Sequence, residues 1–226
     1  MASVSIILGT TGTGKSTSIR GLDPKETVII NVLGKRLPFK GSNTVYNREK
    51  KNLFQVESSE EIVRLIEQID KNAPHVKNVI IDDCSYTMRK EYFNRAKERG
   101  YDRFVDIAVH TQQIIQACEK AREDIDVFLM YHSEDVVDNG TIVTYKIATI
   151  GKMLDQTYNP MEVVPVVLFA TTKFDDKGMP TYGFITHRMQ LNGVAIPAKS
   201  PHGMFKDDFI PNDLGLVKKA FVEYYN

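Results

Sequence analysis

The chain has 226 residues, enough to bury a core of its own, so we expect one domain spanning residues 1–226. Its 29 Lys and Arg residues balance 29 Asp and Glu residues, and this zero net charge excludes a globally basic nucleic-acid binder but not a local basic face. No stretch approaches the roughly 20 apolar residues of a membrane span, so we expect no membrane partner. The two cysteines, Cys84 and Cys118, show neither metal-ligand spacing nor a disulfide framework, so we expect a cytoplasmic protein.

The first informative stretch is a glycine-rich loop between an apolar segment and a short helix. Residues 4–8 predict a buried strand, and residues 16–20 can open a helix. The nine residues from Gly9 to Thr17 fit G-x-x-x-x-G-K-[ST] without a mismatch. In this motif backbone N–H groups surround phosphate oxygens, Lys15 reaches the β- and γ-phosphates, and the Ser16 hydroxyl ligates Mg²⁺. The predicted phosphate site comprises Gly9, Thr10, Thr11, Gly12, Thr13, Gly14, Lys15, Ser16 and Thr17.

The following segments alternate between predicted strands and helices. Residues 27–32 form a β-branched run that predicts a second buried strand. The basic stretch 34–52 predicts an irregular loop, either solvated or in contact with a nucleotide or nucleic acid. A capping box, Ser58 to Glu61, predicts the start of a helix that ends before Pro74.

Two acids follow the strand predicted for residues 79–81. Ligands of an open α/β sheet bind beyond the carboxyl ends of its strands. Asp82 is therefore predicted to hold Mg²⁺ together with Ser16. Asp83 is predicted to orient or deprotonate an attacking water, the alternative being a helix N-cap or a more distant acid.

A basic and aromatic stretch lies in the two helices predicted for residues 85–100 and 102–122. Basic groups interleaved with aromatic rings can follow a phosphate backbone and stack on bases. The alternative is an amphipathic helix with a solvated basic side. The candidate DNA-binding residues are Arg89, Lys90, Arg95, Lys97, Arg99 and Arg103.

The strand predicted for residues 126–132 ends in His132 at the same sheet edge as Asp82. A polar residue there can touch the γ-phosphate or its water and respond to hydrolysis. His132 is therefore a candidate catalytic sensor, the alternative being a capped core histidine.

The second half of the chain predicts antiparallel strands. Asn139-Gly140 between alternating apolar residues is a hairpin signal. Strands are predicted over residues 161–170 and 182–186, and residues 188–211 are irregular. A final helix is predicted to end at Tyr224.

This order of motifs resembles the RecA-like P-loop core, and in particular the phage AAA-type ATPases called the Sak-four group of single-strand annealing recombination proteins. The resemblance rests on residues 9–17, residues 80–83, the strand end at His132 and the closing pattern from Ala198 to Leu214. It implies an α/β fold with a mostly parallel central sheet, helices on both faces and antiparallel hairpin strands in the C-terminal half.

The resemblance also implies an ATPase that uses ATP and Mg²⁺, is stimulated by single-stranded DNA and anneals or pairs strands in recombination or replication. It implies a location in the cytoplasm of a bacterial host. It further implies a head-to-tail homo-oligomer, a ring or filament, in which Lys199 of a neighbour completes the catalytic site, with Lys152 as second choice. A single-strand DNA-binding protein is a further candidate partner.

One position departs from the RecA-like pattern. The second strand would end in a catalytic glutamate, but here Asn31 stands near its end. Either Asp83 or Glu57 substitutes, or hydrolysis is slow. Two other functions stay open: a small-molecule P-loop kinase, although the Val136–Ile150 hairpin lacks the arginines of a phosphate lid, and an assembly scaffold that binds ATP without significant turnover.

Overall fold

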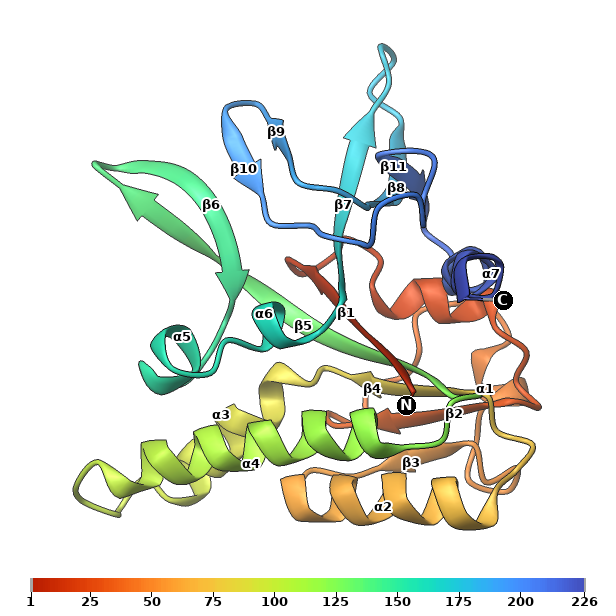
Figure 1. Cartoon of the computed structure of the whole chain (residues 1–226), viewed down its shortest axis with the longest axis vertical. Coiled ribbons are helices and arrows are strands. Elements are labelled where there is room, and N and C mark those ends of the chain that lie inside the picture. Colours follow the sequence, from red (N-terminus) through yellow and green to blue (C-terminus); the bar gives the residue numbers. More distant parts are fainter. Residues whose placement is uncertain (1, 226) are drawn as a thin grey trace.

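The computed structural model describes residues 2–225, and its largest element is a mixed sheet whose central strands are parallel (Figure 1). These are, in spatial order, β7 (Val166–Phe174), β1 (Ser3–Gly9), β5 (Asp126–Asp138), β4 (Asn78–Asp82), β2 (Thr27–Asn31) and β3 (Leu53–Gln55). Two antiparallel strands, β8 (Pro180–Ile185) and β11 (Phe209–Pro211), extend the sheet beyond β7. Parallel strands place their carboxyl ends at one edge, so the predicted phosphate loop, Asp82 and His132 share that edge.

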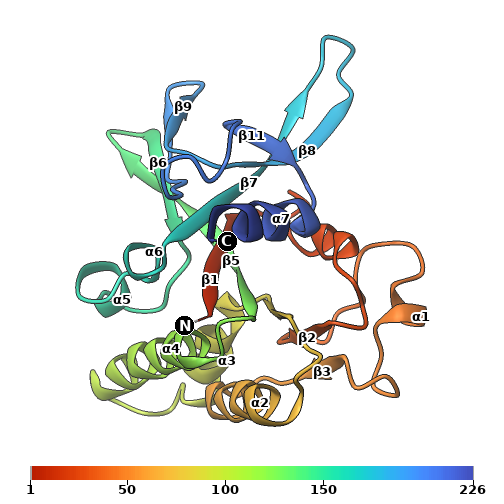
Figure 2. The ribbon, with the colours of Figure 1, turned by 45° about the vertical axis from the view of Figure 1, so that its right-hand side comes forward.

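Helices cover both faces of the sheet because the central strands are apolar on both sides. Ile6 and Leu8 of β1 pack in one core with α2 (Ser59–Asn72) and α4 (Asp102–Lys120). Ile7, between them, faces the opposite core. That core contains the short 3₁₀ helix η1 (Ser16–Gly21) and α7 (Leu214–Tyr225), which lies on the far side of the sheet from α2 and α4 (Figures 1 and 2). The alternation of buried residues along β1 thus sets the three-layer arrangement.

The C-terminal half carries hairpins that project beyond the carboxyl edge of the sheet (Figure 1). β5 continues past His132 and pairs antiparallel with β6 (Thr141–Ile147). Positive φ angles at Asn139 and Gly140 make the predicted tight turn between them. The remaining elements are β9 (Met189–Leu191), β10 (Val194–Ile196), α1 (Ser42–Val45), α3 (Ser85–Asn94), α5 (Met153–Gln156) and α6 (Pro160–Val163).

The prediction of an α/β fold with a mostly parallel sheet is confirmed, but several boundaries were wrong. Residues 161–165 are not strand, because the Asn159 side chain accepts a hydrogen bond from Met161 N and starts α6. The helix expected to reach residue 100 ends at Asn94, where Arg103 binds carbonyl groups of the following turn.

Three local expectations also differ from the structure. The segments expected to be irregular contain the helix α1 and the strands β9, β10 and β11. Ser58 does precede α2, but its side chain makes no capping hydrogen bond. No helix among residues 2–225 is long and apolar enough to cross a lipid bilayer.

Asp126 is the first residue of β5, at the edge of the sheet away from the phosphate loop, and its carboxyl group should destabilise the fold as pH rises. Burial raises the pKa of Asp126 from 3.8 to about 6, although the Lys218 charge and a Ser3 hydrogen bond oppose this. Between pH 4 and 6 the native state keeps a proton that the unfolded chain has released, so stability falls across this range. Asp126→Asn should therefore raise the free energy of unfolding by about 2–3 kcal/mol at pH 8 and change it little at pH 4.

Urea denaturation at both pH values would measure this difference. The exposed Asp138, changed to asparagine, is the matched control and should alter stability little at either pH. An equal effect of Asp126→Asn at both pH values would contradict the assigned shift.

Candidate functional site

The loop between β1 and η1 needs its glycines. Gly12 and Gly14 have φ angles of 85° and 87°, in the region that favours glycine. A Cβ on Gly9 would lie 2.7 Å from the backbone oxygen of Ala170 on β7. A side chain would therefore strain the backbone at Gly12 and Gly14 and prevent the close approach of Gly9 to β7, which accounts for the glycines of the sequence motif.

Lys15 is buried at the centre of this loop. Its Nζ donates to the carbonyl oxygens of Gly9 at 2.7 Å and Thr10 at 2.8 Å, and the residue is 7% exposed. Burial lowers the pKa of Lys15 to about 8, against the opposing charges of Asp83 and Asp82. Lys15 is thus a desolvated cation whose direct hydrogen-bond partners are neutral carbonyl groups, and anionic phosphate oxygens would satisfy it better.

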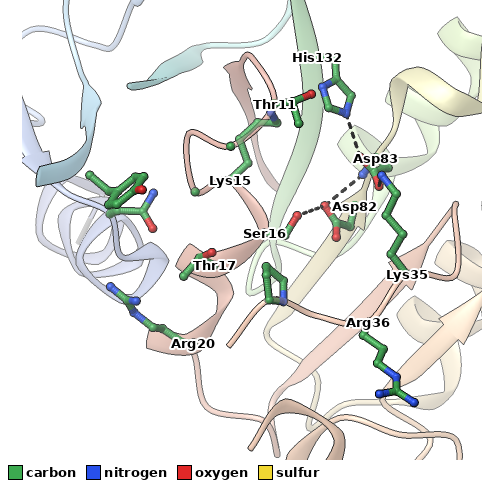
Figure 3. A pocket seen from close by; sticks show the side chains of 15 residues that line it. Thr11, Lys15, Ser16, Thr17, Arg20, Lys35, Arg36, Asp82, Asp83 and His132 are labelled. Atoms are coloured by element: carbon green, nitrogen blue, oxygen red, sulfur yellow. Dashed lines mark hydrogen bonds and ion pairs between the residues drawn. The ribbon is translucent and has the colours of Figure 1, made fainter. Parts of the chain in front are cut away.

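Ser16 and Asp82, 66 residues apart, meet at the carboxyl end of β4. The Ser16 hydroxyl donates to Asp82 Oδ1 at 2.8 Å (Figure 3). Burial, together with the charge of Asp83, raises the pKa of Asp82 to about 6. A hydroxyl and a buried carboxylate are the hard oxygen ligands that Mg²⁺ accepts, and a bound cation would relieve the cost of burying the carboxylate.

No cluster of three or more His, Cys, Asp or Glu side chains suited to a metal occurs among residues 2–225. Mg²⁺ needs no such cluster, because it commonly takes one or two protein oxygens and completes its shell with substrate phosphates and water. The Ser16–Asp82 pair therefore fits Mg²⁺ that arrives with a nucleotide.

Asp83 lies directly beyond Asp82 and both of its carboxylate oxygens have partners. His132 Nε2 lies 2.9 Å from Oδ1, and Lys35 Nζ lies 3.4 Å from Oδ2 (Figure 3). Burial would raise the pKa of Asp83, but the His132 hydrogen bond and the Lys35 charge outweigh it and lower the pKa. Its φ of 58° is uncommon outside glycine. Asp83 therefore remains ionised near neutral pH.

His132 is held in place by two further contacts. Its backbone N–H donates to Ser85 Oγ at 2.9 Å, and the Tyr86 ring packs edge-on against its imidazole at 5.8 Å between ring centroids. His132 can contact Asp83 because β5 lies between β1 and β4 in the sheet. His132 is thus a neighbour of the phosphate loop and of Asp83 at once.

These groups line a single cavity of about 530 Å³ (Figure 3). Thr11, Gly12 and Gly14 to Thr17 form part of its wall, as do Asp82, Asp83 and His132. Sequence analysis left open a nucleotide contact for the basic stretch 34–52, and Lys35, Arg36 and Pro38 of that stretch do line the cavity. The other wall residues, Arg20, Tyr182 and Asn212, were not among the predicted site residues; Asn212 belongs to the closing pattern of residues 198–214, and no motif marks Arg20 or Tyr182.

Three other residues considered for the catalytic step, Lys199, Lys152 and Glu57, do not line this cavity. Lys199 does not line it; its Nζ donates to the Glu162 carbonyl at 3.1 Å and its backbone pairs with Val167. Its predicted role requires a neighbouring chain. Lys152, the second choice, immediately precedes α5, and its side chain makes no capping hydrogen bond. Glu57, the alternative catalytic acid, is paired with Lys90 Nζ at 2.6 Å.

The six predicted DNA-binding side chains divide into two groups. Arg95 forms ion pairs with three carboxylates, from Glu91, Glu98 and Asp106. Lys90 is paired with Glu57, and Arg103 donates to backbone carbonyls and lies over the Tyr92 and Phe104 rings. The side chains left for the predicted DNA contact are Arg89, which lies over the Tyr86 ring, and the exposed Lys97 and Arg99.

No protein-family model matches the chain, and no curated protein is significantly similar to it. Its classification therefore rests on its own geometry. The chain is an α/β protein with a mostly parallel mixed sheet and a polar cavity at the carboxyl ends of the central strands.

Proposed function

We propose that this chain is a P-loop nucleoside triphosphatase with a RecA-like core that binds ATP with Mg²⁺ and hydrolyses it. The observation that carries the proposal is the meeting of three groups in one cavity: Lys15, the Ser16–Asp82 pair and the Asp83–His132 pair. A cavity of about 530 Å³ also falls within the size range of small-molecule sites.

The phosphate loop would bind the triphosphate. Its backbone N–H groups face the phosphates, and Lys15 exchanges its carbonyl partners for β- and γ-phosphate oxygens. Ser16 and Asp82 would hold Mg²⁺, which neutralises charge on the phosphates and stabilises the charge that develops during transfer. The phosphates would give the buried Lys15 ammonium a counter-charge, and Mg²⁺ would give one to the buried Asp82 carboxylate.

Asp83 would orient the attacking water. The second strand ends in Asn31, and two acids among the described residues line the cavity; Asp82 is assigned to Mg²⁺, which leaves Asp83 for the water, with His132 holding one of its oxygens. This arrangement favours turnover over a scaffold that merely binds ATP, because a bound nucleotide alone requires no positioned acid beyond the Mg²⁺ ligand.

A small-molecule kinase is less well supported. Such an enzyme needs a cationic lid over the phosphates and a place for an acceptor. Among the described residues, no part of the β5–β6 hairpin beyond His132 lines the cavity. Transfer to water is therefore the reaction we propose.

We propose single-stranded DNA as the macromolecular partner, in strand annealing or pairing during phage recombination or replication in the cytoplasm of a bacterial host. The resemblance carries this part, and Arg89, Lys97 and Arg99 are the predicted basic side chains left to contact DNA on a neutral protein. Binding through so few phosphate contacts should be weak, and its salt dependence should be shallow because the slope scales with the number of phosphates contacted.

The proposed oligomer is head-to-tail, with Lys199 of a neighbour reaching the cavity. Phe174 and Met179 at the end of the β7–β8 hairpin are exposed, and large exposed apolar side chains favour contact with another chain. Light scattering with and without a non-hydrolysable ATP analogue would measure assembly directly.

The test of the proposed reaction is product analysis. ATP labelled at the γ-phosphate should yield labelled inorganic phosphate in the presence of Mg²⁺, without any added nucleoside monophosphate. Labelled nucleoside diphosphate that forms only when a monophosphate is added would identify a kinase instead. Binding of a fluorescent ATP analogue without either product would identify a scaffold.

A further inference from the structure

The loop after β2 has a fixed shape that brings a lysine to the cavity. Asn31, buried at the end of β2, accepts a hydrogen bond from Gly34 N at 2.8 Å and donates to the Lys35 carbonyl at 2.6 Å. Gly34 has a φ of 67°, which favours glycine at this turn. The Asn31 side chain therefore sets the path of residues 31–35.

Lys35 reaches Asp83 from this turn. Its Nζ lies 3.4 Å from Asp83 Oδ2 and 5.6 Å from the centroid of the Tyr86 ring. The Lys35 side chain is 63% exposed, whereas that of Asp83 is 10% exposed. An ion pair with one largely solvated partner contributes little to stability, so the ammonium can exchange Asp83 for a stronger anion at low cost.

Four cations line the cavity within the described part of the chain: Lys15, Arg20, Lys35 and Arg36. Lys15 belongs to the phosphate loop. Of the other three, Lys35 is the one paired with a site carboxylate, and Figure 3 shows its side chain directed at Asp83 while that of Arg36 points away.

We propose that Lys35 is a catalytic cation acting within its own chain, an inference that rests on the proposed ATPase function. Its ammonium leaves Asp83 Oδ2 and binds a γ-phosphate oxygen, where negative charge must be stabilised during transfer. The same movement frees Asp83 Oδ2 for the attacking water, while His132 keeps Oδ1.

The chemical step balances. The water oxygen forms a bond to the γ-phosphorus as the bond from that phosphorus to the β–γ bridging oxygen breaks. ADP leaves with the electron pair of the broken bond, and the water proton passes to Asp83 and then to solvent. The products are ADP and inorganic phosphate.

The experiment compares Lys35→Ala with Lys40→Ala, a lysine of the same loop that is exposed and does not line the cavity. Lys35→Ala should lower kcat about 10²-fold and leave the Kd for a non-hydrolysable ATP analogue within about threefold. It should also lose most of the affinity for ADP with aluminium fluoride, a mimic of the phosphoryl group in transfer. Lys35→Arg should retain much of the activity, and Lys40→Ala all of it.

Mixing variants distinguishes action within one chain from action between chains. Lys15→Met chains mixed with Lys35→Ala chains should show no recovery of activity, because each intact site needs both lysines on one chain. Recovery of activity on mixing would overturn the role of Lys35, and so would a kcat for Lys35→Ala within about threefold of native. In either case, turnover by the native protein would still support the proposed ATPase function. A native protein that binds neither nucleotide probe would overturn both proposals.

Discussion

Lys15→Met is expected to abolish detectable binding of Mg·ATP and to lower ATP hydrolysis by at least about 10²–10³-fold. Methionine keeps the length of the side chain but removes the ammonium that should contact the β- and γ-phosphates. The same change should stabilise the nucleotide-free protein, because burial lowers the pKa of Lys15 to about 8 and the charged form is therefore disfavoured in the fold. We expect the free energy of unfolding at pH 7 to rise by about 1–3 kcal/mol.

Nucleotide binding by calorimetry and unfolding by urea measure the two effects on one variant. Lys25→Met is a matched control at an exposed loop position outside the cavity, and should change neither quantity appreciably. If Lys15→Met bound Mg·ATP as tightly as the native protein, the loop would not be a triphosphate site. A loss of both binding and stability would instead indicate an unfolded variant.

Asp82→Asn is expected to remove the dependence of nucleotide affinity on Mg²⁺ and to lower hydrolysis by about 10²–10³-fold. Asparagine keeps an oxygen that can accept the bonds now made by Ser16 Oγ at 2.8 Å and Asp83 N at 3.1 Å, so the local fold should persist. The lost quantity is the negative charge that would attract the cation. Titrating a fluorescent ATP analogue at several Mg²⁺ concentrations measures this directly.

Two outcomes of the Asp82→Asn titration are informative. An affinity that no longer rises with Mg²⁺, with ADP affinity in EDTA unchanged, supports the Ser16–Asp82 pair as the metal ligands. A Mg²⁺ dependence equal to that of the native protein would place the cation elsewhere in the cavity.

Local sequence patterns were sufficient for much of the fold. Glycine spacing predicted the conformation of residues 9–17, and the apolar runs in β1, β2, β4 and β5 predicted buried strands. These features depend on nearest neighbours in the chain. The short helix α6 was missed because Asn159 caps it and Pro160 begins it, whereas residues 161–165 were expected to form a strand.

The side-chain partners within the site depend on strand order, which the chain order does not reveal. Asp83 and His132 meet because β5 is inserted between β1 and β4. Lys35 reaches Asp83 because the Asn31 side chain turns the loop after β2. The missing glutamate near Asn31 is visible in the sequence, but the contact between Lys35 and Asp83 is not.

The basic stretch illustrates the same limit. The spacing of Glu91 and Arg95 by four residues already indicates an ion pair at the end of a helix, and Glu98 pairs with Arg95 from the turn that follows α3. The third partner, Asp106, becomes visible only when α3 and α4 pack together. Basic residues counted along a sequence therefore overstate the positive charge that a surface offers to DNA.

The decisive measurement for the proposed reaction is phosphate release from Mg·ATP by the native protein, with and without single-stranded DNA, beside Lys15→Met. We predict Mg²⁺-dependent release that DNA accelerates and that the Lys15→Met chain lacks. Release that DNA leaves unchanged would retain the ATPase and contradict its proposed partner. No release above the Lys15→Met background, with or without DNA, would contradict the central claim that this cavity hydrolyses ATP.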